Sequence, residues 1–543
     1  MKFFYRPLAV LVILLLQISA VSASDIVEVI PLTDRIIMVH FDDGYVRHHQ
    51  KGEARTNEWV IQDPLNVALA TQLGSYTVSS ADDSNFGGGV QPSDIGRKSK
   101  GTDFTWLCQD YNDEVGCINS DADHAKEHWI YLYLDNPLQA GSTYTITTGD
   151  LAANGNSYEL LYDPKLASSR SEAVHVNIIG YAPTAPKKYG YVYHWAGDKG
   201  GLDLSPYAGA TFWLVNTTDN SVAYTGAIAF RKAANNVETG QPDDTPDDNF
   251  LGAEVYEADF SDFATPGEYR LAVEGIGSSF PFIIDDNAYF EPYYNIVRGL
   301  YHQRSGIALE QPYTEYTRPA PHNPNITPGF AGKLQYTTSR FVDWEKQDHS
   351  DNDKPAIEAG IQGPLDTYGW YQDAGDWDGY FSHLRIPSWL LFLYEFAPTK
   401  YPDNQLNIPE SGNGVPDLVD EAAWLPRFFH RTRQELIAKG YGTGGVGSRV
   451  AGDWFGGDGE GVPSYEDVNR TYIVSGEDPF STYKYAGTAA HLAIALQKAG
   501  VTDPEGVDWL QEATEAYTWA QANTRDGDEE PVFGLRLSDQ RLY

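Results

Sequence analysis

Three patterns of hydrophobic and polar positions follow one another along the chain, and they predict different architectures. From residue 25 to about 168, β-branched and aromatic residues alternate or form short runs between turns rich in Gly, Asp and Asn. A second strand-like region runs from about Glu172 to Asp285, where Thr265-Pro266-Gly267 marks a turn before a strand over Tyr269–Val273. From Ala288 the apolar positions recur with a helical period. We therefore expect two β-sandwiches followed by an all-α region.

The helical region contains five segments with a clear pattern. They are Tyr289–Leu309, with a stop near Gly306, Ser382–Phe396, the helix after Gly414, Tyr483–Ala499 and Val507–Ala522. The third is the clearest, because Pro416 stands in its first turn, an apolar stripe runs from Val415 to Phe429, and Gly440 follows its end. The segment Ser382–Phe396 is apolar on all sides, which predicts that it is buried.

The N-terminus and the overall charge restrict the location and the partners. Lys2 and Arg6, the apolar stretch Leu8–Leu16 and the small residues Val21-Ser22-Ala23 have the pattern of a secretory signal over residues 1–23. No later segment is apolar over 18 residues, so we expect a secreted or periplasmic monomer with no membrane attachment after signal cleavage. With 38 Lys+Arg against 76 Asp+Glu, the formal charge of −38 argues against nucleic acid and anionic membranes as partners.

Two features of the strand-rich half bear on cross-linking and metals. Cys108 and Cys117 are the only cysteines, and either form a short-loop disulfide or remain free thiols. We expect the disulfide, as a local staple with no catalytic role. The acidic stretch Asp243–Asp248 has ligands suited to calcium, but a solvated loop is the interpretation that we favour.

The segment Gly369–Tyr380 concentrates the residue types that glycoside hydrolysis requires. Asp373 and Asp376 lie three positions apart, so both carboxylates could act on one water molecule. Aromatic side chains, which can stack on sugar rings, surround them: Trp370, Tyr371, Trp377 and Tyr380. Asp and Gly clusters also shape ordinary loops, so the segment alone leaves both interpretations open.

Three motifs in the same order resemble glycoside hydrolase family 9, the inverting cellulases. Trp370–Asp376 resembles the family's WYDAGD signature, with Gln372 where the family usually has Asp. Pro409–Ala422 resembles its ESGNGIPDLLDEA helix start. The second strand region, residues 172–286, resembles the immunoglobulin-like domain that precedes many of these catalytic domains. The resemblance covers about residues 172–543 and leaves residues 24–168 as a β-sandwich of unknown role.

The resemblance implies a fold, an activity and site residues. Residues 287–543 would be the N-terminal part of an (α/α)6 barrel. Asp376 would be the general base, and Asp373 would hold the nucleophilic water. The implied sugar-binding residues are Trp370, Tyr371, Trp377, Tyr380 and, in the segment Pro463–Asp467, Tyr465. The chain would thus be a secreted endo-β-1,4-glucanase that hydrolyses β-glucan with inversion.

Two departures from the family pattern change these expectations. Relatives with the immunoglobulin-like domain often bind structural zinc through Cys and His, but Ser305 and Pro321 stand here where the thiols would be. His322 alone cannot complete a four-ligand site, so we expect no zinc and no cofactor, and an ordinary hydrogen-bonding role for His322.

The second departure concerns the general acid. The family supplies it as a Glu in an Asn-Glu pair near the end of the domain, and the only Asn-Glu here is Asn57-Glu58 in the first sandwich. The predicted helices are also too few for a complete barrel. We therefore expect the acid to lie beyond Tyr543 and this fragment alone to be inactive. The alternatives are a non-catalytic polysaccharide-binding protein, or a family member acting on mixed-linkage glucan, xyloglucan or oligosaccharide ends.

Overall fold

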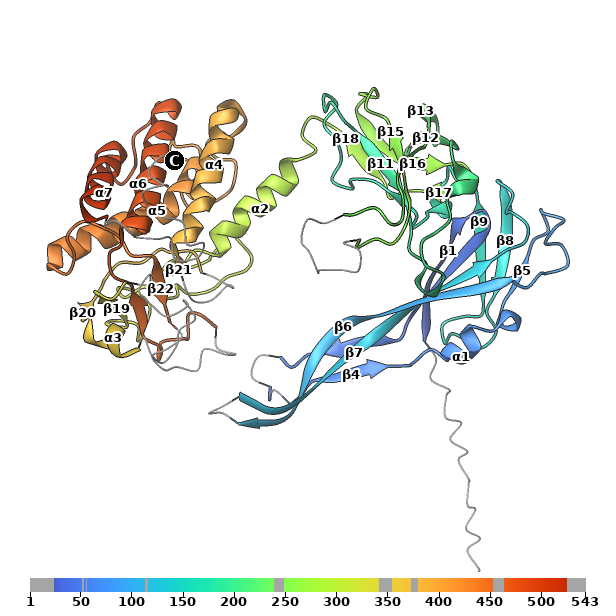
Figure 1. The fold of residues 1–543 in the computed structure, drawn as a ribbon, viewed down its shortest axis with the longest axis horizontal. Coiled ribbons are helices and arrows are strands. Elements are labelled where there is room, and N and C mark those ends of the chain that lie inside the picture. The colour runs from blue at the N-terminus through green and yellow to red at the C-terminus, as the bar shows by residue number, and fades with distance from the viewer. Residues whose placement is uncertain are drawn as a thin grey trace, which may run out of the picture. The chain divides into compact units, whose positions relative to one another are not determined.

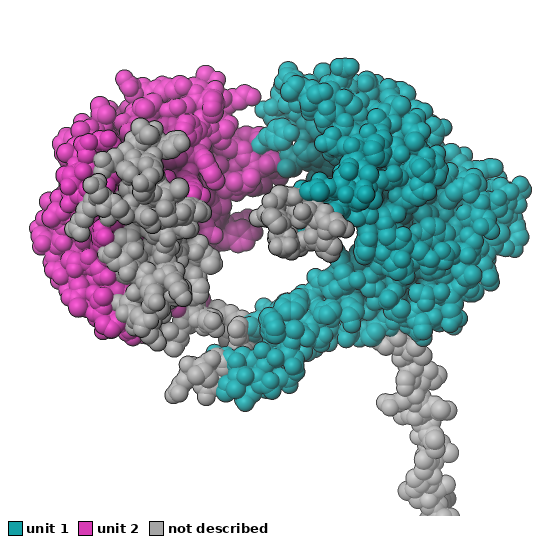
Figure 2. Space-filling model, in the orientation of Figure 1, with its two compact units in different colours: residues 1–289 teal, residues 290–543 magenta. Residues whose placement is uncertain are grey.

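The computed structural model divides the chain into two compact units, residues 1–289 and residues 290–543 (Figure 2). The described residues are 24–50, 53–54, 56–112, 116–238, 249–340, 354–372, 379–452 and 463–524. The predicted signal, the acidic stretch Asp243–Asp248 and the three motif residues Asp373, Asp376 and Trp377 lie outside them. Among the described residues, no helix combines the length and apolar character needed to cross a membrane.

The first part of unit 1 contains two antiparallel sheets and a two-stranded ribbon (Figure 1). The first sheet has the order β1 (Asp25–Thr33), β2 (Ile36–Asp42), β7 (Gly116–Tyr133) and β6 (Asp94–Asn112). The second has the order β5 (Thr77–Ser79), β8 (Ser142–Thr147) and β9 (Ser157–Tyr162), and the ribbon pairs β3 (Gly44–Arg47) with β4 (Trp59–Gln62). Helix α1 (Val67–Ala70) and the 3₁₀ turns η1 (Leu73–Ser75) and η2 (Ala167–Ser169) complete it.

The immunoglobulin-like part consists of two further sheets. One has the order β10 (Val174–His175), β11 (Tyr189–Val192), β15 (Val255–Asp259) and β14 (Ala229–Lys232). The other has the order β13 (Val222–Ala227), β12 (Thr211–Asn216), β16 (Gly267–Val273) and β17 (Gly277–Ser278), with β18 (Phe282–Ile284) also paired to β16. The 3₁₀ turns η3 (Gly197–Lys199) and η4 (Ser205–Tyr207) lie between β11 and β12. Strand β16 follows the predicted Thr-Pro-Gly turn.

The first sheet is shared between two cores, which explains why the two predicted sandwiches form one compact unit. Side chains alternate between the faces of a strand. On β2 and β7, Val39 and Ile130 belong to the core beneath β5-β8-β9, whereas Met38 and Tyr131 belong to the core of the immunoglobulin-like part. Because both faces of the sheet are covered there, β2 and the end of β7 are apolar at consecutive positions, over Ile36–Val39 and Trp129–Leu132.

Strands β6 and β7 form a hairpin that extends beyond the two cores (Figure 1). Their pairing continues from Asp94 opposite Tyr133 to Asn112 opposite Gly116. A disulfide joins Cys108 to Cys117, with 5.7 Å between their Cα atoms. The cross-link therefore ties the two strands together near the end of the hairpin.

Unit 2 is helical, as predicted, but it also contains a sheet, so the expectation of an all-α region was wrong in this respect. The helices are α2 (Phe290–His302), α3 (Lys354–Ala359), α4 (Arg385–Phe396), α5 (Asp417–Lys439), α6 (Pro479–Ala499) and α7 (Trp509–Asn523), with 3₁₀ turns η9 (Phe381–Leu384) and η10 (Pro398–Lys400). The sheet order is β20 (Ile361–Pro364), β19 (Leu334–Thr337), β23 (Tyr472–Val474), β22 (Arg449–Ala451) and β21 (Gly379–Tyr380). These strands are too short to produce a clear alternating pattern in the sequence.

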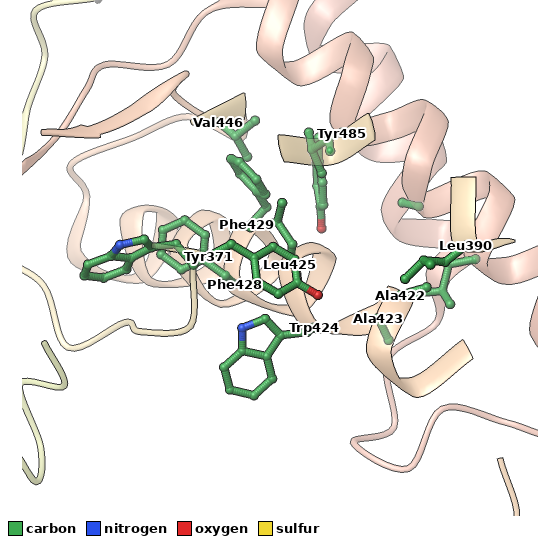
Figure 3. Packing of buried hydrophobic residues seen from close by; sticks show 14 of the residues in the cluster. Tyr371, Leu390, Ala422, Ala423, Trp424, Leu425, Phe428, Phe429, Val446 and Tyr485 are labelled. Atoms are coloured by element: carbon green, nitrogen blue, oxygen red, sulfur yellow. The ribbon is translucent and has the colours of Figure 1, made fainter. Parts of the chain in front are cut away.

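Helix α5 is the centre of the unit 2 core. Its predicted apolar stripe is buried, and Figure 3 shows Leu425, Phe428 and Phe429 within the cluster. Polar residues on its other sides are buried as well, among them Asp420 and Glu421. The helix ends at Gly440, whose φ of 71° is the left-handed conformation that glycine adopts easily.

Helix α4 is buried on one face only, which corrects the prediction that it is buried all round. Leu391 and Tyr394 lie in the core, but Trp389 is 68% exposed and Phe396 is 85% exposed. The face that carries Leu391 and Tyr394 packs against α5 and α6. The helix is therefore apolar on all sides, but the described residues cover only one of its faces.

Candidate active site

The aromatic and acidic motif of residues 369–380 lies between β20 and β21 of unit 2, and the structure describes its two ends. Trp370, Tyr371 and Gln372 are described at the first end. At the second end the backbone of Tyr380 is described as part of β21, while its side chain lies outside the description. The predicted base Asp376, its partner Asp373 and Trp377 lie between these ends, outside the described residues.

The first end of the motif is fixed by backbone pairing to the segment after α2. The Ser305 amide donates to the Trp370 carbonyl oxygen at 2.9 Å, and the Gln372 amide donates to the Gln303 carbonyl oxygen at 2.9 Å. Arg304 and Tyr371 form an antiparallel bridge between these two bonds. The residue immediately before Asp373 is therefore held in a defined backbone position.

The second end is fixed by the sheet. Gly379 pairs with Val450 and Tyr380 with Arg449 across β21 and β22. Gly379 also packs on the Trp370 ring so closely that an added Cβ would lie 2.8 Å from Trp370 Cδ1. The glycine is needed for this approach, which places Gly379 against Trp370 at the other end of the motif.

Trp370 and Tyr371 support the motif from the core, which corrects their prediction as sugar-stacking residues. Trp370 is 1% exposed and Tyr371 2% exposed, so neither ring face is available to a ligand. Tyr465 of the second predicted cleft segment is half-buried.

A buried ionic cluster joins the first end of the motif to α5. The Tyr371 hydroxyl donates to Glu421 Oε1 at 2.6 Å, and the Arg304 guanidinium pairs with Glu421 at 2.9 Å and with Glu410 at 2.9 Å. Burial raises the pKa of Glu421, an effect that Arg304 opposes. Burial would lower the pKa of Arg304, but the two carboxylates raise it above its usual value. The cluster thus holds one cation, Arg304, beneath the motif between two carboxylates.

A second buried network links the motif to the segment Pro463–Asp467. The Tyr472 hydroxyl donates to Asp467 Oδ2 at 3.2 Å, so His322 Nε2 must donate to the Tyr472 oxygen, at 3.0 Å. His322 Nδ1 is then an acceptor, 3.5 Å from both Ser305 Oγ and Gln372 Nε2. Burial lowers the pKa of His322 to about 3, with Arg318 and Arg470 acting in the same direction. The neutral imidazole connects the two motif segments.

The surroundings of His322 do not fit a structural zinc ion. Hydroxyls and an amide surround the imidazole, whereas such sites use thiolate, imidazole or carboxylate ligands in a tetrahedral set. Within the described residues, no group of three or more His, Cys, Asp and Glu side chains is arranged to hold a metal ion. His322 forms hydrogen bonds.

The acidic residues at the start of α5 are structural. Asp417 accepts hydrogen bonds from the Leu406 amide at 2.6 Å, the Asn404 amide at 3.0 Å and the Ser411 hydroxyl at 2.7 Å. These bonds fold the loop that precedes the helix. The sequence indicated the helix start but gave no sign that its acids point into the protein, or that Arg304, Glu421 and Tyr472 support the site.

Asp420 gives a pH-dependent test of this arrangement. It is 1% exposed, its Oδ2 accepts from Asn413 Nδ2 at 3.0 Å, and burial raises its pKa to about 7. Between the usual carboxyl pKa of roughly 4 and 7, the folded state holds a proton that the unfolded chain releases, so this stabilisation is lost as the pH rises. We expect Asp420→Asn to increase the free energy of unfolding by about 1–3 kcal/mol at pH 8 and to change it little at pH 4, measured by urea denaturation. An equal effect at both pH values would contradict the assignment.

The comparisons with known proteins concern both units. Residues 169–278 match the family model described as the cellulase N-terminal ig-like domain. The chain is 30% identical over 322 residues to a cellulose 1,4-beta-cellobiosidase of Acetivibrio thermocellus, covering 55% of this chain and 31% of that protein. It is 26% identical over 301 residues to endoglucanase D of the same organism, covering 54% of this chain and 39% of that protein. The chain thus spans well under half of these relatives' lengths.

A similar solved structure is described as a metagenome-derived glycoside hydrolase family 9 endoglucanase. The TM-score is 0.48 and the identity is 23%, covering 67% of this chain and 57% of that one.

Proposed function

We propose, from the relationship of this chain to the glycoside hydrolase family 9 cellulases that carry an N-terminal immunoglobulin-like domain, that the protein hydrolyses β-1,4-glucan. In this proposal it is a secreted endo-β-1,4-glucanase with an inverting mechanism. Unit 2 would be the N-terminal part of an (α/α)6 barrel. The names of the two relatives include both a cellobiosidase and an endoglucanase, so the mode of attack is part of the test.

The observation that carries the proposal is the anchoring of both ends of the motif around Asp373 and Asp376. A general base must hold its position relative to the attacking water to within a fraction of an ångström. Backbone pairing fixes Gln372, and the sheet fixes Gly379. In this proposal Asp376 removes a proton from the water that attacks the anomeric carbon, and Asp373 accepts the second hydrogen of that water. The bond from that carbon to the glycosidic oxygen breaks as a separate general acid, the Glu that the family resemblance implies, gives this oxygen a proton.

The test is the anomeric configuration of the first product. The full-length protein, as its gene encodes it, is incubated with cellohexaose, and the products are followed by ¹H NMR before mutarotation. We expect the α-anomer first, because direct attack by water inverts the β-linkage. Initial formation of the β-anomer would contradict the assignment of Asp376 as base.

The endo mode is tested separately with soluble hydroxyethylcellulose. An endo-acting enzyme lowers the viscosity long before many reducing ends appear, because it cuts within the chain. Release of reducing sugar with unchanged viscosity would favour attack from chain ends and contradict the endo assignment.

A further inference from the structure

Unit 1 contains a pocket of about 300 Å³ on the outer face of the sheet that includes β16. Along β16, Tyr269 and Leu271 belong to the core of the immunoglobulin-like part, so Glu268 and Arg270 lie on the opposite face. The segment that follows β9 covers part of this face and contacts β17 through η2. The pocket lies where the segment meets the sheet, and residues of both line it, among them Ala167, Arg170, Thr217, Glu268, Arg270 and Phe280.

Arg270 is buried in the wall of this pocket without a counter-ion. It is 7% exposed and forms no ion pair with any described residue. Its Nη2 donates to Asn220 Oδ1 at 2.7 Å and to the Lys165 carbonyl oxygen at 3.5 Å, whereas its buried Nε has no hydrogen-bond partner among the described residues. Burial lowers the pKa of Arg270, an effect that Glu268 opposes. The buried Arg304 of unit 2 differs, since it lies between two carboxylates. Because a buried charge without a counter-ion is costly, an anion bound beside Arg270 would be stabilised.

The other charged groups of the pocket already have partners. Arg170 Nη2 donates to Glu28 Oε1 at 2.7 Å and to Glu28 Oε2 at 2.5 Å, so its charge is compensated. Glu268 Oε2 accepts from the Thr217 hydroxyl at 2.5 Å, and the Glu268 side chain is exposed. The wall therefore presents one unpaired cation, Arg270, and one exposed carboxylate, Glu268.

These two groups restrict the chemistry of a ligand. A carboxylate supplies the counter-ion that Arg270 lacks, through a charge-assisted hydrogen bond. The Glu268 carboxylate only accepts hydrogen bonds, so it favours a hydroxyl group on the same molecule. A phosphate or sulfate dianion would bring a second negative charge, which Glu268 repels. The pair of groups therefore fits a hydroxylated molecule with a single carboxylate.

The size and the apolar part of the pocket restrict the ligand further. Sites for small organic molecules have volumes of roughly 300–1,000 Å³, so this pocket is at the small end of the range and fits one sugar unit. Phe280 and Pro281, which are exposed, and Ala167 add apolar surface to the polar wall. Such surface suits the C–H groups of a sugar ring better than it suits a fully hydrated inorganic ion.

From these observations we infer that the pocket beside β16 binds one sugar acid unit, with its carboxylate on Arg270 and a hydroxyl group on Glu268. The site and its preference for a hydroxylated monocarboxylate rest on the structure of unit 1. The choice of a sugar acid among such molecules rests on the proposed function, since a protein that acts on polysaccharides meets sugar acids as free sugars or as branches.

The experiment is isothermal titration calorimetry of the full-length protein with sodium glucuronate. We expect saturable binding at one site. Glucose, which lacks the carboxylate, and acetate, which lacks the hydroxyl groups, should each bind roughly tenfold or more weakly in competition titrations. Inorganic phosphate and glycine should also bind more weakly than glucuronate.

Variants of the two wall residues locate the binding. Arg270→Met should weaken glucuronate binding roughly tenfold or more. Glu268→Ala should reduce the preference for glucuronate over acetate, and because Glu268 is exposed, this variant provides a test even if Arg270→Met does not fold. The matched control is Arg231→Met, which should bind glucuronate like the wild type, since Arg231 lies in the same part of the chain but is exposed and paired with Glu257.

The source of the sugar acid is distinguished by affinity electrophoresis. One gel contains glucuronoxylan, and the other contains the same xylan after removal of its uronic acids. Retardation in the first gel alone would assign the site to a uronic acid branch of a polysaccharide. Binding of free glucuronate without retardation in either gel would assign it to the free sugar acid.

Three results would overturn the inference. One is the absence of glucuronate binding, or equal binding by the wild type and a folded Arg270→Met variant. Another is equal affinity for acetate and glucuronate in the wild type. The third is tighter binding of phosphate or glycine than of glucuronate. The Asp376→Asn variant should bind glucuronate like the wild type. A protein that binds the sugar acid but hydrolyses no glucan would therefore contradict only the proposed function, and an active protein that does not bind the acid would contradict only this inference.

Discussion

Replacing Asp376 with Asn in the full-length protein should lower kcat on hydroxyethylcellulose by roughly 10²–10⁴-fold while KM changes little. An amide keeps the size and polarity of the carboxylate but cannot accept the proton of the attacking water. The expected loss therefore falls on the chemical step. Initial rates of reducing-end formation measure it, with the wild type assayed at the same protein concentration.

The matched control is Asp366→Asn. Asp366 lies in the same unit, is exposed and pairs with Lys439 on the surface, so the same chemical change there should leave the rate within about twofold. Asp373→Asn should reduce kcat less than Asp376→Asn, because its proposed task is to orient the water. Near-wild-type hydrolysis by the Asp376→Asn variant would remove this residue from the mechanism and leave the general base to be found elsewhere.

The sequence predicted the helices and strands of this protein better than it predicted which of them pack against one another. Helix α5 shows why, since the spacing of its apolar residues and the glycine after its last turn are local features. The sharing of the β1-β2-β7-β6 sheet between two cores is a tertiary feature. The consecutive apolar residues Ile36–Val39 are compatible with it, but they do not say which elements cover the two faces.

The site shows a second limit of sequence analysis. The type of Trp370 and Tyr371 suggested sugar stacking, but an aromatic side chain serves equally well in a core, and burial decides between the two roles. The contact between His322 and Tyr472 joins residues 150 positions apart, and no spacing in the sequence announces it. The clustering of acidic and aromatic residue types predicts a catalytic site at residues 369–380, and this assignment stays a prediction.

Removing the charge of Arg304 should strongly destabilise unit 2. Its side chain is fully buried between Glu421 and Glu410, and Glu421 is fully buried as well. Arg304→Met would leave the Glu421 carboxylate with the Tyr371 hydroxyl but without its cation. A buried charge that loses its partner costs about 3–5 kcal/mol, so we expect a loss of that size in the free energy of unfolding. Urea denaturation followed by circular dichroism at 222 nm, which reports mainly on the helices of this unit, measures it.

The double variant Arg304→Met/Glu421→Leu separates the ion pair from packing. Because it removes both charges, it should recover much of the stability that the single variant loses, a pattern expected only if the unpaired Glu421 carboxylate is the source of the loss. Lys439→Met is the surface control and should cost no more than about 1 kcal/mol, since its partner Asp366 is exposed. If the single and double variants were equally unstable, packing around Arg304 would explain the effect. Packing of the side chains would then stabilise the cluster beneath the motif. The positive charge of Arg304 would not be needed to hold Tyr371 and the residues leading to Asp373.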